Sequence, residues 1–202
     1  MTRPSALGVA VLTVIVLAAG LRAGQALTRQ DSDSMVRKIK AIDARAAEPP
    51  SNGAKPLRTT LTEREVNAFL KYDGQKQLPV GLTDPQITIN ENGQLEGRAI
   101  VDLDAVRKTQ SSMLLDLIAM VTGSVEVRAS GRLQTADGKG TLVLDRTTVA
   151  GISVPKGVLQ SVVTHYSRTP ELPNGFDLDK PFDLPSAIRS VETLRGSAVI
   201  VQ

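Results

Sequence analysis

Side chains that could perform acid–base or nucleophilic chemistry are few in this chain and lie far apart. His165 is the only histidine, and no serine lies in the G-x-S-x-G turn that presents a nucleophile in many hydrolases. A single histidine without a partner motif is more typical of a surface or packing residue than of a catalytic base. The sequence therefore indicates a protein that is not an enzyme, and an exported hydrolase is the interpretation it favours least.

Acidic residues provide one weak candidate for a metal site. Asp177, Asp179 and Asp183 are its members, and the first two begin like a calcium-binding loop. Pro181 stands where a third ligand belongs, and no closing glutamate follows. Zinc would need several His or Cys ligands, and the chain has no cysteine. We therefore expect no metal and no cofactor, and interpret this segment as a solvated loop.

The first 26 residues have the features of an export segment. Arg3 supplies an early positive charge, residues 6–21 contain no charged residue, and Gly24 and Ala26 are small residues at the positions that signal peptidase reads. Arg22 ends the apolar run early, which slightly favours a cleaved signal peptide. An uncleaved transmembrane anchor is the alternative, because the run of about 16 residues approaches the length of a membrane span. We expect a periplasmic protein, or one anchored to the inner membrane and facing the periplasm.

Composition limits the other classes of function. Without Arg3 and Arg22, which fall in the export segment, the formal charge drops from +3 to +1, so no strongly basic domain remains. Aromatic residues make up only 2% of the 202-residue chain, and stacking platforms for bases are therefore scarce. We expect no nucleic-acid partner. The absence of cysteine excludes both disulfides and a lipid-modified bacterial lipoprotein.

The remaining chain divides into a linker and one domain. Residues 27–55 are expected to form a flexible linker, partly helical at 28–45 and rich in proline, serine and glycine at its end. Residues 56–202 are expected to form a single α+β domain. It opens with a short helix, in which Thr62 is the N-cap and Glu65 completes a capping box. Glu63 and Glu65 are two positions apart and lie on different helix faces, so they do not form a catalytic pair.

Alternating apolar and polar residues predict antiparallel hairpins after this helix. The expected strands cover residues 86–90, 94–103, 124–133, 141–149, 188–194 and 197–202. Two apolar stretches, 111–121 and 155–166, are expected to be helices, and residues 167–185 a proline-punctuated loop. The fold class is therefore α+β, with a curled antiparallel meander sheet wrapped on two or three helices and preceded by an N-terminal signal or anchor helix.

Two segments also resemble a known family. Residues 61–70, LTEREVNAFL, look like the opening LTExExNxxL of several bacterial envelope families, and residues 151–166, GISVPKGVLQSVVTHY, fit the strand and helix that such proteins contain. The order of elements over most of 61–202 resembles the TULIP-like lipid-binding proteins, including bacterial phospholipid-binding envelope proteins. The matching motifs concern capping and packing, so no ligand-contacting residue carries over. The resemblance implies binding of an acyl chain or lipid in an apolar groove, without catalysis.

The residues most suited to line such a groove lie on the two apolar helices. They are Leu114, Leu117, Ile118, Val158, Leu159 and Val162. Small residues on the inward faces of two strands, at positions 97, 99, 129 and 131, leave room for a lipid tail or for a closely packed helix, and helix packing is the more usual outcome. The alternative function is a structural or protein-interaction domain of the cell envelope with a filled core. Its partner could bind an exposed strand edge such as 197–202.

Overall fold

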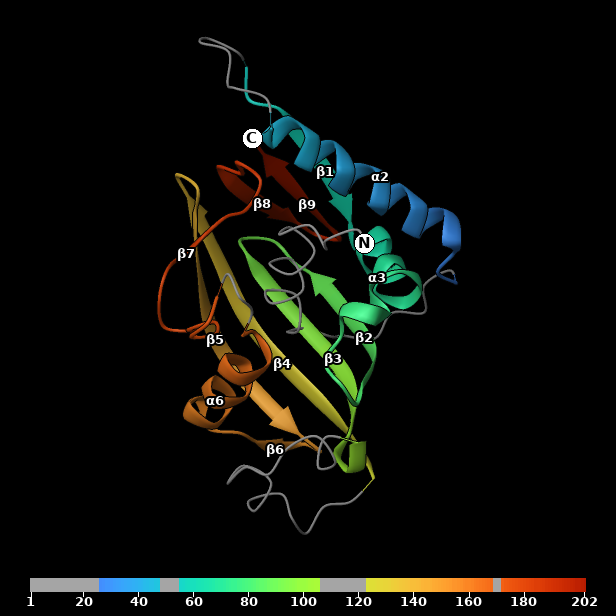
Figure 1. Ribbon diagram of the computed structural model, residues 1–202, viewed down its shortest axis with the longest axis vertical. Coiled ribbons are helices and arrows are strands. Elements are labelled where there is room, and N and C mark those ends of the chain that lie inside the picture. Colours follow the sequence, from blue (N-terminus) through green and yellow to red (C-terminus); the bar gives the residue numbers. More distant parts are fainter. Residues whose placement is uncertain (1–25, 48–54, 106–122, 169–171) are drawn as a thin grey trace.

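The computed structural model describes residues 26–47, 55–105, 123–168 and 172–202, whose strands form two antiparallel sheets (Figure 1). The larger sheet has six strands, five of them in the order β2–β3–β4–β5–β6, while β7 pairs with β5. The smaller sheet has the order β1–β9–β8. This arrangement confirms the expected α+β class with an antiparallel meander, and the sheet does not close on itself. The expected N-terminal signal or anchor helix lies outside the described residues.

Both central hairpins form as the alternation predicts. The strands are β2 (Leu82–Ile89), β3 (Gln94–Asp102), β4 (Ser124–Ala136), β5 (Lys139–Val149), β6 (Ile152–Ser153) and β7 (Phe182–Asp183). The turn between β2 and β3 needs glycine at position 93. Gly93 has a φ of +79°, and a Cβ there would lie 2.1 Å from the carbonyl oxygen of Leu133 on β4. The turn between β2 and β3 therefore packs directly against β4.

The larger sheet has an apolar inner face and a polar outer face. Ile87, Gly97, Ala129 and Thr147 are aligned across β2, β3, β4 and β5, so they share one face, which we call the inner face. The outer face carries charged pairs, such as Arg98 of β3 with Glu126 of β4 at 2.5 Å. Helices can therefore cover only the inner face without burying charge.

Helix α3 (Glu63–Tyr72) confirms the predicted capping box. The backbone N–H of Glu65 donates to the Thr62 hydroxyl at 3.2 Å, and the Thr62 N–H donates back to the Glu65 carboxylate at 2.8 Å. The predicted stripe of Val66, Phe69 and Leu70 is buried. Two turns of local sequence therefore determine both the start of this helix and the face that it buries.

The helix expected within residues 28–45 forms, but the expectation that this segment is a flexible linker is wrong. Residues Arg29–Ala46 form an 18-residue helix, α2, which packs against α3 at the edge of the molecule (Figure 1). Three apolar side chains one to two turns apart, Met35, Ile39 and Ile42, are buried. They join the α2–α3 core, whose buried members are Met35, Ile39, Ile42, Leu61, Val66, Phe69, Leu70, Ile87, Ile89, Ile188 and Ile200. The folded domain therefore starts before Arg29 rather than at residue 56.

The carboxyl terminus lies inside the smaller sheet. This sheet consists of β1 (Arg58–Thr62), β8 (Ser190–Leu194) and β9 (Ser197–Val201). The terminal hairpin is confirmed, but β9 pairs with β8 on one side and with β1 on the other. Segment 197–202 therefore offers no open edge over β9, and the expectation that a partner could bind there is wrong. The β1 strand, which the sequence did not predict, fills that position.

Helix α6 (Lys156–Tyr166) confirms the predicted helix after Pro155, and it lies over β5 (Figure 1). With the following loop it forms a second group, the α6 cluster, whose members are Ala129, Leu142, Leu144, Leu159, Val163, Phe176, Leu178 and Phe182. Ala129 of this cluster and Ile87 of the α2–α3 core lie in one row of the inner face. Helices α3 and α6 therefore cover different parts of the same face.

Candidate functional site

The six predicted lining residues fall into two groups. Leu114, Leu117 and Ile118 lie outside the described residues. Val158, Leu159 and Val162 lie on α6, and all three are half-buried. Leu159 packs into the α6 cluster, whereas Val158 and Val162, one helical turn apart, belong to neither described cluster. The structure therefore places one predicted lining residue in a filled core, whereas the other two lie outside the clusters formed by the described residues.

A set of aliphatic side chains on the inner face also lies outside both described clusters. Ala99, Val127 and Val149 are aligned across β3, β4 and β5, and Val101 follows Ala99 on the same face. We call these four residues the apolar floor. Its three valines are half-buried. Helix α6 begins just after β6, which pairs with Val149, so the floor and α6 meet at the same end of the sheet. Together they are the best candidate for a binding surface.

The small residues of the inner face do not all leave room for a ligand. Ala129 is packed in the α6 cluster with Phe176 and Leu178. At Gly131 a Cβ would lie 2.7 Å from the carbonyl oxygen of Val143, where the pairing of β4 and β5 is irregular, so this glycine permits close backbone approach. The small residue at position 129 therefore serves packing against α6 and its loop, and the glycine at position 131 serves the close approach of two strands. Gly97 and Ala99 are buried and belong to neither described cluster.

The candidate catalytic and metal residues are dispersed on the surface. His165 is exposed on α6. The carboxylates of the 177–183 loop are engaged by lysines: Lys180 with Asp177 at 2.9 Å, Lys139 with Asp183 at 2.6 Å, and Lys156 with Asp179. The Lys180 ammonium also lowers the pKa of Asp177. No group of three or more potential metal ligands occurs in the ranges that the structure describes.

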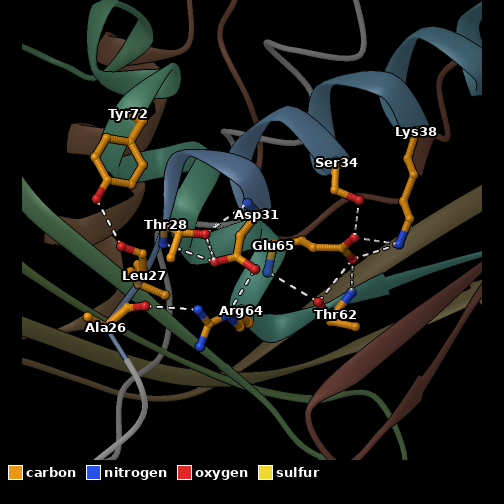
Figure 2. Close-up of polar contacts among 10 residues, drawn as sticks. All are labelled: Ala26, Leu27, Thr28, Asp31, Ser34, Lys38, Thr62, Arg64, Glu65 and Tyr72. Carbon is orange, nitrogen blue, oxygen red and sulfur yellow. Dashed lines mark hydrogen bonds and ion pairs between the residues drawn. The ribbon is translucent and has the colours of Figure 1, made fainter.

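The most organised polar group is one that sequence reasoning missed. Figure 2 shows how α2 and α3 exchange ion pairs through Asp31, Lys38, Arg64 and Glu65, which we call the helix clasp. Arg64 of α3 meets Asp31 of α2 at 2.9 Å, and Lys38 of α2 meets Glu65 of α3 at 2.7 Å. Each acid also completes the capping box of its own helix. Each helix therefore supplies a cation that pairs with the capping carboxylate of the other helix.

The clasp holds both carboxylates in their charged form. Burial opposes ionisation of Glu65, but hydrogen bonds from Lys38, Ser34 and Thr62 outweigh it and lower its pKa to about 2. At Asp31, the hydrogen bond from Arg64 and then that from Thr28 lower the pKa well below its usual range. Glu65 is only 7% exposed, so these donors replace most of the water that a free carboxylate would bind.

The same elements fix the place where the chain enters the domain. Arg64 donates to the carbonyl oxygen of Ala26 at 2.8 Å, and the Tyr72 hydroxyl donates to that of Leu27 at 2.9 Å. Arg29 and Lys71 lie 5.1 and 5.4 Å from the centre of the Tyr72 ring (Figure 2 shows the tyrosine). Residue 26 therefore joins the folded domain directly, without a flexible spacer between it and α2.

Two further polar residues of the LTEREVNAFL segment protect a strand edge. The Asn67 amide pairs with both backbone groups of Ile87, donating to its carbonyl and accepting from its N–H at 2.7 Å each. The Glu63 carboxylate accepts from the N–H of Ile89 at 2.8 Å. Because β2 is an edge strand, these side chains occupy backbone groups that another strand could otherwise bind. Positions 63 and 67 thus hold β2, while position 65 holds α2.

Replacing Asn67 with alanine is expected to lower the free energy of unfolding by about 2–3 kcal/mol, because two part-buried backbone groups lose their partners. Urea denaturation followed by circular dichroism would measure this change. Asn90→Ala is a matched control, since the Asn90 amide makes only a 3.5 Å contact with Glu96. A loss at Asn67 no larger than that at Asn90 would contradict the proposed role of the amide.

Comparisons with known proteins leave the function open. No protein-family model matches the chain, and no curated protein or solved structure matches it significantly. Among the residues that the structure describes, none of the helices is both long enough and apolar enough to span a membrane. The function is therefore inferred from the residues of the site itself.

Proposed function

We propose that this chain is a non-enzymatic protein of the bacterial envelope that holds a lipid or another amphiphile between its sheet and its helices. The N-terminal segment would export it or anchor it to the inner membrane. The observation that carries the proposal is the apolar floor, whose three valines are half-buried on the inner face without belonging to either described cluster. Val158 and Val162 of α6 add apolar surface at the same end of the sheet.

The binding energy would come from burial of an acyl chain, with the sheet curling around it. Each methylene group taken out of water contributes about 0.8 kcal/mol to binding. An acyl chain of ordinary length therefore needs no specific polar contact with the protein. The resemblance of residues 61–70 and 151–166 to lipid-binding envelope families supports the same ligand class.

Lipid binding can be tested by purifying the full chain from detergent-solubilised membranes and identifying co-purifying lipids by mass spectrometry. We expect a stoichiometric lipid that is enriched over an unrelated exported domain. Val127→Trp should fill the floor and abolish this enrichment. Val143→Trp is the matched control, because Val143 lies on the outer face of the neighbouring strand and is 45% exposed.

Two results would refute lipid binding in this place. One is an absence of enrichment over the control domain. The other is lipid retained at the original stoichiometry in Val127→Trp, with circular dichroism showing that this variant is folded. Either would favour the second candidate function, a structural or protein-interaction domain, which the filled α6 cluster around Ala129 supports.

A further inference from the structure

The solvent-facing side of α2 is predominantly basic. Its core-facing residues Met35, Ile39 and Ile42 place positions 29, 33, 37, 40 and 44 on the opposite side of the helix. Arg29, Arg37 and Lys40 are exposed there, and Asp33 is the acidic residue of this row. Lys71, at the end of α3, is also exposed beside Arg29, and both cations lie near the Tyr72 ring.

Other charged groups of the two helices are already engaged within the protein. Lys38 and Arg64 are paired in the helix clasp, and the Arg45 guanidinium donates to the Thr59 hydroxyl at 3.0 Å. Asp43 accepts from Ser186, and Asp73 accepts from Ser32. The basic row is therefore the part of α2 whose charges face outward, and we call Arg29, Arg37, Lys40 and Lys71 the basic face.

The position of the basic face indicates the kind of surface that it contacts. The chain reaches α2 from residues 6–21, which carry no charge, and Ala26 and Leu27 are fixed to α3 by Arg64 and Tyr72. Any membrane held by that apolar segment must lie close to the start of α2. Tyrosine flanked by cations is a composition that suits the lipid headgroup region, where the ring is partly buried and the charges meet phosphate.

We propose that the basic face of α2 docks on an anionic phospholipid surface, so that the helix lies along the membrane rather than pointing away from it. Arg29 and Lys71 would contact headgroups at the entry point, and Arg37 and Lys40 would extend the contact along the helix. Each cation near an anionic surface strengthens binding several-fold, and salt weakens the attraction. This inference rests on the membrane anchoring in the proposed function but not on lipid binding at the apolar floor.

The absence of cysteine allows a single fluorescent label to report the orientation in the full chain. Ala44→Cys places the label on the same side of α2 as the basic face, about 22 Å along the helix from Arg29. Val143→Cys, on the outer face of β5, is the control site. Each labelled chain is reconstituted in vesicles of equal parts phosphatidylcholine and phosphatidylglycerol, with a headgroup quencher, and in phosphatidylcholine alone.

We expect quenching at position 44 in the anionic vesicles and at least threefold less in the neutral ones, with little quenching at position 143. The variant Arg37→Gln/Lys40→Gln should weaken docking by roughly tenfold, and about 1 M salt should do the same. The matched variant Arg132→Gln/Arg146→Gln removes two exposed arginines from the outer face of the sheet and should change nothing.

The proposal is overturned if the label at position 44 is not quenched in anionic vesicles, or if its quenching is the same in neutral vesicles or in the Arg37→Gln/Lys40→Gln variant. A chain that does not sediment with vesicles at all would refute the anchoring as well. Failure of docking together with a stoichiometric co-purified lipid would leave the proposed function standing, so the two results are distinguishable.

Discussion

Replacing Met35 with alanine is expected to lower the free energy of unfolding by about 2–5 kcal/mol, because the change leaves a cavity in the α2–α3 core. Met35 is 1% exposed and shares this core with Leu70 of α3 and Ile200 of β9. Small domains are stable by only about 5–15 kcal/mol, so a single change of this size would be visible in any denaturation experiment.

Urea denaturation of the full chain measures the effect of Met35→Ala directly. Arg37→Ala is the matched control on the opposite side of the same helix, and we expect it to change stability by no more than about 0.5 kcal/mol. If Met35→Ala were as mild as Arg37→Ala, residues 29–46 would behave as the flexible linker that composition suggested, and the packing of α2 would be refuted.

Helix α3 could be predicted because its signals are local. Thr62 and Glu65 are three residues apart, and Val66, Phe69 and Leu70 follow at once, so one short segment specifies both the cap and the buried face. Helix α2 has the same kind of cap, Thr28 with Asp31, but its buried stripe is narrow and its other faces are charged. Without knowledge of α3 as a partner, such a segment resembles a solvated linker.

Strand pairing illustrates a second limit of sequence reasoning. The alternation in residues 197–201 predicts a strand correctly, yet it does not indicate which strands lie beside it. The neighbour on one side is β8, joined by a short turn, and the other is β1, from the opposite end of the described domain. Long-range pairings of this kind are not encoded in the local pattern, and the edge was therefore assigned wrongly.

The candidate site shows the same limit at the level of single residues. Val158 and Leu159 are neighbours in one apolar stripe, and the sequence gives no reason to separate them. In the structure Leu159 packs into the cluster that the sheet and the 176–178 loop form, whereas Val158 lies outside it. That loop is held to α6 by Gln160, whose amide donates to the Phe176 carbonyl at 2.9 Å and accepts from the Leu178 N–H at 2.7 Å. A polar residue of α6 thus helps to hold the loop whose apolar side chains complete this cluster.

Replacing Glu65 with glutamine is expected to lower the free energy of unfolding by about 2–3 kcal/mol near neutral pH. Glutamine keeps the size of the side chain but removes the charge that faces Lys38, which is 2.7 Å away. Loss of one partner from a largely buried ion pair costs more than loss of an exposed pair, although the Lys38 side chain is 30% exposed and water recovers part of its charge. The capping box is weakened at the same time.

The effect of Glu65→Gln should depend on pH in a defined direction. The pKa of Glu65 is lowered from its ordinary value of 4.5 to about 2 in the folded protein. A carboxyl group with a lowered pKa stabilises the fold above its ordinary pKa, and that contribution is lost as the pH falls through the folded value. The stability difference between the native chain and Glu65→Gln should therefore be constant above about pH 5.5 and shrink steadily between about pH 4.5 and pH 2.

Glu192→Gln is the control that separates the clasp from surface charge. Glu192 pairs with Arg58, and both side chains are about half exposed, so its loss should cost less than about 0.5 kcal/mol. Asp31 and the other acids with lowered pKa values titrate in both the native chain and the Glu65 variant, so their contribution cancels in the difference. A difference that persisted undiminished to about pH 2.5 would mean that packing, not the carboxylate charge, makes position 65 important. A difference that vanished over that range would show that the Glu65 charge, which pairs with Lys38, contributes to holding α2 against α3.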